Sequence, residues 1–217
     1  MKTVKLSEGI FSISRLLGKG KSGYSYLIEN GETKYVLKRI HDEPCEYYKF
    51  GDKLDSELKA YARLAGFIPV PRLVEYNTAE KYLVKEYIPG VPVSELAAQG
   101  KVPAEAFREI FSWCRKLYGC GINIDYFPAN FIWTGEQLVY VDYELNTYLE
   151  EWNFENWGIY YWLNAAGMRT LLATGDYRAI NVAKNSGKPI TEPFKALAAE
   201  LAARYNKVDK PGGTPCP

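Results

Sequence analysis

The chain of 217 residues is 47% hydrophobic and 24% charged, the balance of an ordinary soluble protein that buries its own core. Its 27 basic and 26 acidic residues leave a net charge of +1, which argues against general binding to nucleic acid or to an anionic membrane. No apolar run is long enough to span a membrane, and residues 1–20 lack the pattern of a signal peptide, so we expect a cytoplasmic protein.

Cysteine and histidine are sparse in this chain. The four cysteines include no Cys-x-x-Cys pair and are too few for a disulfide scaffold, so we expect reduced thiols. The one histidine, His41, is expected at the surface near the end of a strand. Without a second histidine or paired cysteines, a zinc site is not expected.

The first forty residues predict three strands. Residues 10–17 begin with alternating apolar and polar side chains, and residues 24–29 and 33–40 have the same strand character. Asn30 and Gly31 lie between the last two segments and predict a tight hairpin, because both residues tolerate a positive φ.

A glycine motif, Gly-x-Gly-x-x-Gly at Gly18, Gly20 and Gly23, lies between the first two predicted strands. The motif alone is weak, and a dinucleotide site would require a helix directly after it. Because a strand follows here, we expect a β-hairpin flap whose bare backbone covers phosphate groups.

Residues 52–65 have the apolar spacing of one helical face and contain Glu57. The residues that define this face are Leu54, Leu58, Tyr61, Ala62 and Ala65. An isolated glutamate in a helix is usually a solvated surface acid. The alternative is that the helix packs beside the third strand and directs Glu57 at Lys38, so that the pair holds the lysine toward an α- or β-phosphate.

Residues 70–76 and 81–88 predict two more strands, and Pro and Gly in residues 89–92 indicate a connector between two lobes. Most of the remaining chain predicts helices. The helical segments are 94–98 with Ser94 as N-cap, 103–118, 154–166, a segment between Gly175 and Gly187, and 191–205. We therefore divide the chain into an N-lobe at 1–88, a C-lobe at 89–207 and a disordered tail at 208–217.

The stretch 121–144 holds two carboxylates, Asp125 and Asp142, and one amide, Asn130. Two short apolar runs around a Thr-Gly-Glu-Gln turn predict a tight hairpin that fixes these polar groups relative to one another. Two acids and an amide held together suggest metal and phosphate chemistry, provided that the rest of the chain supplies a nucleotide site.

The ordered set of these landmarks resembles the protein-kinase-like superfamily over about residues 12–165. The landmarks are the glycine motif, Lys38, Glu57, the connector from Lys85 to Gly90, Asp125-x-x-x-x-Asn130, and Asp142. Each is common alone, but their order and spacing make coincidence a poor explanation. The resemblance implies an α+β, bilobal protein-kinase-like fold: a five-stranded antiparallel N-lobe with one helix, and a compact, mainly helical C-lobe.

The resemblance also implies roles for individual residues. Lys38, partnered by Glu57, and the glycine flap would hold the phosphates of ATP, and backbone groups near Glu86 and Ile88 would bind the adenine. Asp125 would orient or deprotonate the acceptor hydroxyl. Asn130 and Asp142 would hold Mg²⁺, which prefers a few hard oxygen ligands.

Several positions depart from the pattern of eukaryotic protein kinases. Asn123 and Ile124 stand where His and Arg are usual, and Phe127 replaces the lysine that Ser/Thr kinases place two positions after the aspartate. Activation through a phosphorylated loop is therefore not expected. The short segment after Asp142 and the pairing of Asp142 with Glu144 are similar to aminoglycoside and choline phosphotransferases. Lipopolysaccharide-kinase-like and RIO-like kinases are also close in pattern.

These features lead to the expectation of an ATP- and Mg²⁺-dependent kinase that phosphorylates a hydroxyl of a small molecule or of an atypical Ser/Thr protein substrate. The alternative is a pseudokinase, a nucleotide-binding or interaction module without transfer activity, because the usual histidine and the lysine equivalent to Phe127 are missing. A purely structural scaffold would need all the landmarks to be accidental. No nucleic-acid partner and no membrane span are expected.

Overall fold

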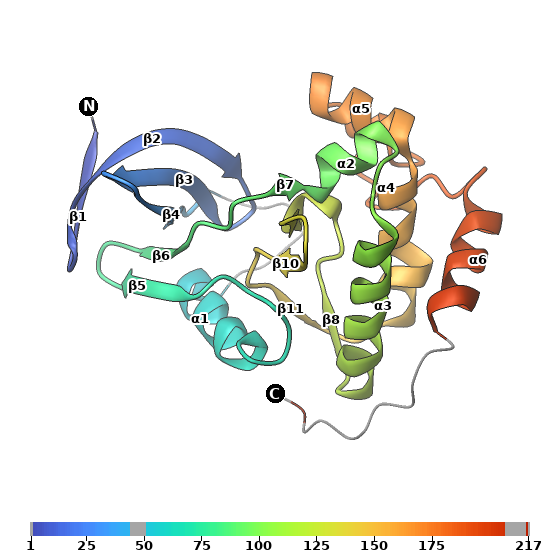
Figure 1. The fold of residues 1–217 in the computed structure, drawn as a ribbon, viewed down its shortest axis with the longest axis horizontal. Coiled ribbons are helices and arrows are strands. Elements are labelled where there is room, and N and C mark those ends of the chain that lie inside the picture. The colour runs from blue at the N-terminus through green and yellow to red at the C-terminus, as the bar shows by residue number, and fades with distance from the viewer. Residues whose placement is uncertain (1, 44–50, 207–215, 217) are drawn as a thin grey trace. The chain divides into compact units, whose positions relative to one another are not determined.

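The computed structural model describes residues 2–43, 51–206 and 216, and the chain folds into two compact units (Figure 1). The first unit comprises Met1–Gly66 and Val70–Ile88, and the second comprises Phe67–Pro69 and Pro89–Pro217. The fold is α+β, with one large antiparallel sheet and, within the described ranges, six α-helices. None of the described helices combines the length and the apolar character that a membrane crossing requires.

The first unit is built on a six-stranded sheet with the order β1-β2-β3-β4-β6-β5, in which all neighbours are antiparallel. The strands are β1 (Thr3–Leu6), β2 (Gly9–Lys19), β3 (Gly23–Asn30), β4 (Thr33–Ile40), β5 (Leu73–Asn77) and β6 (Tyr82–Glu86). Buried side chains from five of these strands form one core: Val4, Leu6, Phe11, Ile28, Tyr35, Leu37, Tyr82 and Val84.

The predicted five-stranded sheet is wrong by one strand. The additional strand, β1, pairs along its whole length with the start of β2. It has only four residues, of which Val4 and Leu6 are buried and the other two are exposed. Four residues are too few for an alternating pattern to stand out from the sequence, so the strand was not predicted.

The hairpin between β3 and β4 is present, but its turn lies one residue later than predicted. Asn30 pairs with Thr33, which makes Gly31 and Glu32 the two turn residues. Gly31 has φ of 58°, a conformation that glycine adopts without steric cost.

The helix of the first unit, α1 (Lys53–Leu64), begins after Asp52, whose side chain accepts a hydrogen bond from the amide of Asp55 at 3.0 Å. Its buried face is rotated from the predicted one. The fully buried residues are Leu54, Glu57, Ala60 and Leu64, whereas Ala62 and Ala65 are exposed. Hydrophobicity alone could not place a glutamate on the inner face of a helix.

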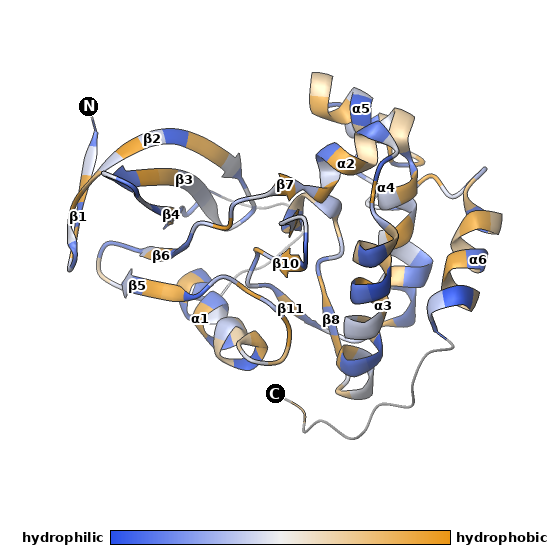
Figure 2. Cartoon of the chain, in the orientation of Figure 1, coloured by the Kyte–Doolittle hydropathy of each residue, from blue (hydrophilic) through white to orange (hydrophobic). Residues whose placement is uncertain are grey.

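The second unit contains the other five described helices. They are α2 (Val93–Gln99), α3 (Ala104–Gly119), α4 (Ile159–Leu163), α5 (Ala165–Thr174) and α6 (Lys195–Tyr205). In α3, hydrophobic and hydrophilic residues are interspersed along the chain (Figure 2), and the buried set includes Phe107, Phe111 and Trp113. Helix α2 contacts α5, and α3 contacts α6. Helix α2 begins one residue before Ser94, with Pro92 at its N-cap, so the predicted Ser94 cap is wrong.

Two predicted helices differ from the structure. The segment 154–166 starts as a wide helical turn at Phe154–Gly158, continues as α4 and breaks at Asn164, whose side chain accepts a hydrogen bond from the amide of Gly167 to begin α5. Between Gly175 and Gly187 only the short helical turn Tyr177–Ala179 forms. The predicted helix there is wrong, because the segment has no continuous apolar face.

Two small sheets complete the second unit. Strands β9 (Phe131–Trp133) and β10 (Leu138–Tyr140) form the predicted hairpin, which is extended by β7 (Val91–Pro92). Strand β8 (Ile122–Ile124) pairs antiparallel with β11 (Leu145–Thr147). Together these strands hold both ends of the stretch that carries Asp125, Asn130 and Asp142.

The expectation of four reduced thiols is contradicted by a disulfide between Cys120 and Cys216. The two cysteines are separated by 96 positions, a pairing that spacing along the sequence does not reveal. Cys114 is free and buried, and Cys45 lies outside the described residues. Apart from Cys216, the predicted tail at 208–217 also lies outside them.

Candidate functional site

Lys38 and Glu57 form a buried ion pair in the first unit. Lys38 lies on β4, between β3 and β6, and its Nζ is 2.6 Å from Oε1 of Glu57 on α1. The two side chains are only 7% and 8% exposed. The structure therefore brings together the two residues that the sequence paired, and Glu57 is not a solvated surface acid.

Ser22 connects the glycine-rich turn to this pair. Its Oγ donates a hydrogen bond of 2.6 Å to Oε1 of Glu57, the same oxygen that contacts Lys38. The second carboxylate oxygen, Oε2, is buried without a hydrogen-bond partner. Sequence reasoning missed Ser22, because a serine among glycines and lysines carries no distinguishing signal.

The three motif glycines occupy different structural positions. Gly18 lies in β2, Gly20 in the turn, and Gly23 begins β3. A Cβ added to Gly23 would lie 2.5 Å from the backbone oxygen of Arg39, so the close approach of β4 requires glycine there. At Gly18 a Cβ would meet nothing within 4 Å, and at Gly20 it would make only an ordinary contact of 3.8 Å. The packing of the chain itself therefore does not explain glycine at these two positions.

Glu86 and Ile88 lie at the end of the first unit. Glu86 is exposed at the end of β6, and its amide donates to the backbone oxygen of Arg72 at 2.9 Å. Ile88 is half-buried and is the last residue of the unit. The amide of Glu86 is thus already used by the backbone of Arg72.

Asp125, Asn130 and Asp142 lie in the second unit and are joined by backbone hydrogen bonds. The amide of Val141 donates to the backbone oxygen of Asn130 at 2.8 Å, which brings Asn130 beside the start of the Asp142 segment. The Nδ2 of Asn130 donates to the backbone oxygen of Asp125 at 3.3 Å. Oδ1 of Asp125 accepts a bond of 3.0 Å from the amide of Phe127, which fixes the carboxylate within its own turn.

Tyr140 links the segments on either side of this acidic group. Its hydroxyl accepts a hydrogen bond of 3.3 Å from the amide of Asp125 and donates one of 3.1 Å to the backbone oxygen of Glu144. Burial raises the pKa of the Tyr140 phenol well above its usual value, and the charges of Asp142, Asp125 and Glu144 raise it further. The hydroxyl therefore stays protonated. The sequence presented Tyr140 only as an apolar strand residue.

Phe127 fills the position where a lysine would be expected. Its ring packs edge-on against Tyr161, with the ring centroids 5.2 Å apart. Burial raises the pKa of Tyr161, and the charge of Asp125 contributes to the same shift. An aromatic side chain, rather than a cation, therefore lies two positions after the candidate catalytic residue Asp125.

Asn130 and Asp142 are the candidate ligands in the second unit, and they suit Mg²⁺ better than a metal that needs three or more protein ligands. Among the described residues, no three His, Cys, Asp or Glu side chains gather in a way that could hold a metal ion. Asn130 uses its Nδ2 as a donor to Asp125, and its backbone is bonded to Val141, next in the chain to Asp142. One amide and one carboxylate suit Mg²⁺, which keeps several waters and binds jointly to phosphate oxygens.

Comparison with known proteins adds no family to this description. No protein-family model matches the chain, and no curated protein matches it.

Proposed function

We propose that this protein is an ATP- and Mg²⁺-dependent phosphotransferase of the bilobal, protein-kinase-like type, transferring the γ-phosphate to a hydroxyl of a small molecule or of an atypical protein substrate. The observation that carries the proposal is the buried ion pair between Lys38 and Glu57, to which Ser22 of the glycine-rich turn is hydrogen-bonded.

A buried ion pair is a poor way to stabilise a fold, because the cost of removing two charges from water offsets most of their attraction. Lys38 therefore calls for an explanation other than stability. A lysine held in one orientation by a carboxylate, close below a glycine-rich turn, is suited to contact the α- and β-phosphates of a nucleotide. The space around Gly18 and Gly20 supports the same function, because a ligand phosphate could approach the backbone there.

The second unit supplies the groups that the transfer step requires. Asp125 would orient the acceptor hydroxyl and receive its proton, while Asn130 and Asp142 would hold Mg²⁺, which neutralises the phosphate charge. Tyr140 keeps the Asp125 loop and the Glu144 segment in register.

One observation favours the alternative, a nucleotide-binding module without transfer activity. Phe127 packs against Tyr161 and places no positive charge near Asp125 to contact the transferred phosphate. The acceptor would then be absent or replaced by a protein partner.

Calorimetric titration of ATP into the full chain, with and without Mg²⁺, tests the proposal. We expect binding that requires Mg²⁺ for full affinity and that weakens in an Asp142→Ala variant. Asp176→Ala is the matched control, because Asp176 is a carboxylate of the same unit that pairs with Arg178 at the surface. If the wild type binds no nucleotide in the presence of Mg²⁺, both functions are wrong.

A further inference from the structure

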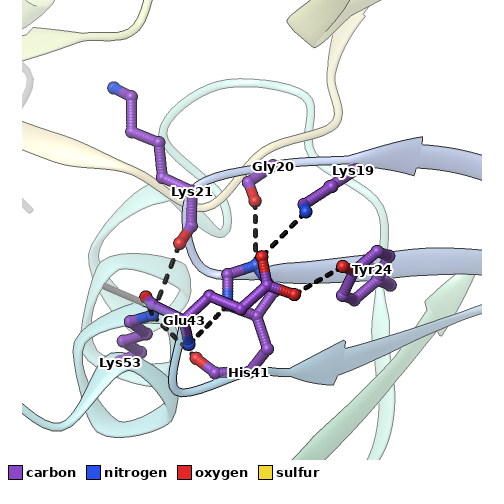
Figure 3. A network of polar contacts seen from close by, with 7 residues as sticks. All are labelled: Lys19, Gly20, Lys21, Tyr24, His41, Glu43 and Lys53. Carbon is purple, nitrogen blue, oxygen red and sulfur yellow. Dashed lines mark hydrogen bonds and ion pairs between the residues drawn. The ribbon is translucent and has the colours of Figure 1, made fainter. Parts of the chain in front are cut away.

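Three successive carbonyl groups of the glycine-rich turn, those of residues 20–22, accept contacts from His41 and Lys53. The backbone oxygens of Gly20, Lys21 and Ser22 contact His41 Nε2 at 3.2 Å, Lys53 Nζ at 3.4 Å and the His41 amide at 3.0 Å, respectively. Figure 3 shows His41 and Lys53 reaching the first two of these groups. Two residues outside the motif therefore account for the position of three successive peptide groups.

The two ring contacts of His41 are compatible with one tautomer of its imidazole. The amide of Glu43 donates to Nδ1 at 3.3 Å, so Nδ1 must carry a lone pair. Nε2 then carries the hydrogen and donates a hydrogen bond to the backbone oxygen of Gly20. The tautomer with its hydrogen on Nε2 is the one compatible with both contacts.

Lys53 occupies a position that disfavours a cation. It is the first residue of α1, where the helix dipole favours negative charge. Its Nζ contacts three backbone oxygens, those of His41 at 2.7 Å, Lys21 at 3.4 Å and Glu43 at 3.5 Å. Each of these carbonyl oxygens can accept a hydrogen bond from the ammonium. A lysine is unfavourable in the first turn of a helix, and its contacts with backbone oxygens offset that cost. Its presence here therefore indicates a role outside the helix itself.

Glu43, two residues after His41, contacts both strands that flank the glycine-rich turn, β2 and β3. Its carboxylate contacts Lys19 Nζ on β2 at 2.7 Å and accepts a bond of 2.5 Å from the hydroxyl of Tyr24 on β3. The hydrogen bond from Lys19 holds the pKa of Glu43 down at about 2, so this anchor stays ionised. The ring of Tyr24 also packs edge-on against His41, at 5.2 Å between centroids.

We propose that His41 and Lys53 are positioning residues that clamp the glycine-rich turn through its carbonyl groups and set it for binding the phosphates of a nucleotide. The C=O and N–H groups of successive residues in a planar peptide point in opposite directions, so holding the carbonyls also sets the direction of the amides. Backbone amides directed together form an anion-binding surface. The clamp deepens the proposed function and rests on it, since it assigns the phosphate contact to a turn that is ordered before the ligand arrives.

The test compares four variants of the full chain. Lys53→Met removes the ammonium and keeps the stem, and Lys59→Met is its control on the same helix, where Lys59 forms an exposed pair with Asp55. His41→Ala removes both ring contacts. His41→Gln retains an amide donor that can reach Gly20.

Two measurements are made on each variant: amide hydrogen exchange of residues 18–24 without ligand, and the dissociation constant of ATP with Mg²⁺. For Lys53→Met and His41→Ala we expect faster exchange confined to this segment. We also expect about tenfold weaker ATP binding, the loss typical of one hydrogen bond to a charged or well-placed group. Lys59→Met is expected to match the wild type, and His41→Gln to recover most of the His41→Ala loss.

The clamp is wrong if exchange in residues 18–24 is unchanged in Lys53→Met and His41→Ala, or if Lys59→Met shows the same changes. It is also wrong if His41→Gln behaves like His41→Ala in both measurements. Failure of the wild type to bind ATP would overturn the proposed function and its extension to phosphates. The exchange measurement would still decide whether the clamp orders the turn.

Discussion

Replacing Lys38, Glu57 or both with methionine separates stability from function at the buried pair. Nζ and Oε1 are 2.6 Å apart, and both side chains are more than nine-tenths buried. Each single variant removes this ionic contact from the buried charge that remains, which costs about 3 to 5 kcal/mol in the free energy of unfolding. The double variant replaces two buried charges by apolar side chains of similar length and should lose less than about 1.5 kcal/mol.

The assay is a double-mutant cycle by urea unfolding, combined with ATP titration. We expect the double variant to be more stable than either single variant, by at least about 1.5 kcal/mol given those costs, and yet to bind ATP as weakly as Lys38→Met. Additive losses in the double variant would show that the two side chains do not depend on each other. Wild-type affinity for ATP in Lys38→Met would refute the phosphate-binding role.

Three further predictions concern other parts of the chain. Tyr140→Phe removes only a hydroxyl, and we expect kcat to fall by about tenfold or more while ATP affinity is unchanged; an unchanged kcat would show that Asp125 does not depend on this contact. Burial raises the pKa values of the Tyr126 and Tyr140 phenols in the folded protein. Their contribution to stability is therefore complete below about pH 10, the unfolded pKa, and is lost as pH rises above it. Phenolate absorbance and circular dichroism should consequently change together in an alkaline titration, and ionisation of every tyrosine with the structure intact would contradict this. Cys216→Ser should lower the free energy of unfolding by about 2 to 4 kcal/mol. A reducing agent should abolish that difference, and equal stability under oxidising conditions would argue against the bond to Cys120.

The sequence predicts those features that depend on a local pattern of apolar and turn residues, or on two opposite charges at a suitable spacing. The hairpin that carries the glycine motif follows from strand signals on both sides of it, and the contact between Lys38 and Glu57 follows from a helix placed beside a strand. The hairpin at residues 131–140 likewise follows from two short apolar runs around a turn. Each hairpin depends on residues that are close in the sequence, and the Lys38–Glu57 contact depends on the packing of one helix against one strand.

Features that depend on distant contacts were not predictable. Strand β1 exists because Val4 and Leu6 enter a core formed by later strands. The inner face of α1 is set by the partner of Glu57, and apolar periodicity alone gives a different face. Tyr140 and Ser22 act through single hydroxyl groups whose partners lie in other segments.

Phosphoryl transfer in which the Asp125 carboxylate receives the acceptor proton is tested by magnesium-dependent ATP consumption. The full chain and an Asp125→Asn variant are assayed against a panel of sugars, amino alcohols, aminoglycosides and generic protein substrates. We expect consumption that at least one acceptor stimulates, that requires Mg²⁺, and that falls by about a hundredfold or more in the variant. Equal turnover in the variant would remove Asp125 from the reaction, and tight ATP binding without any turnover would contradict transfer and favour the nucleotide-binding module.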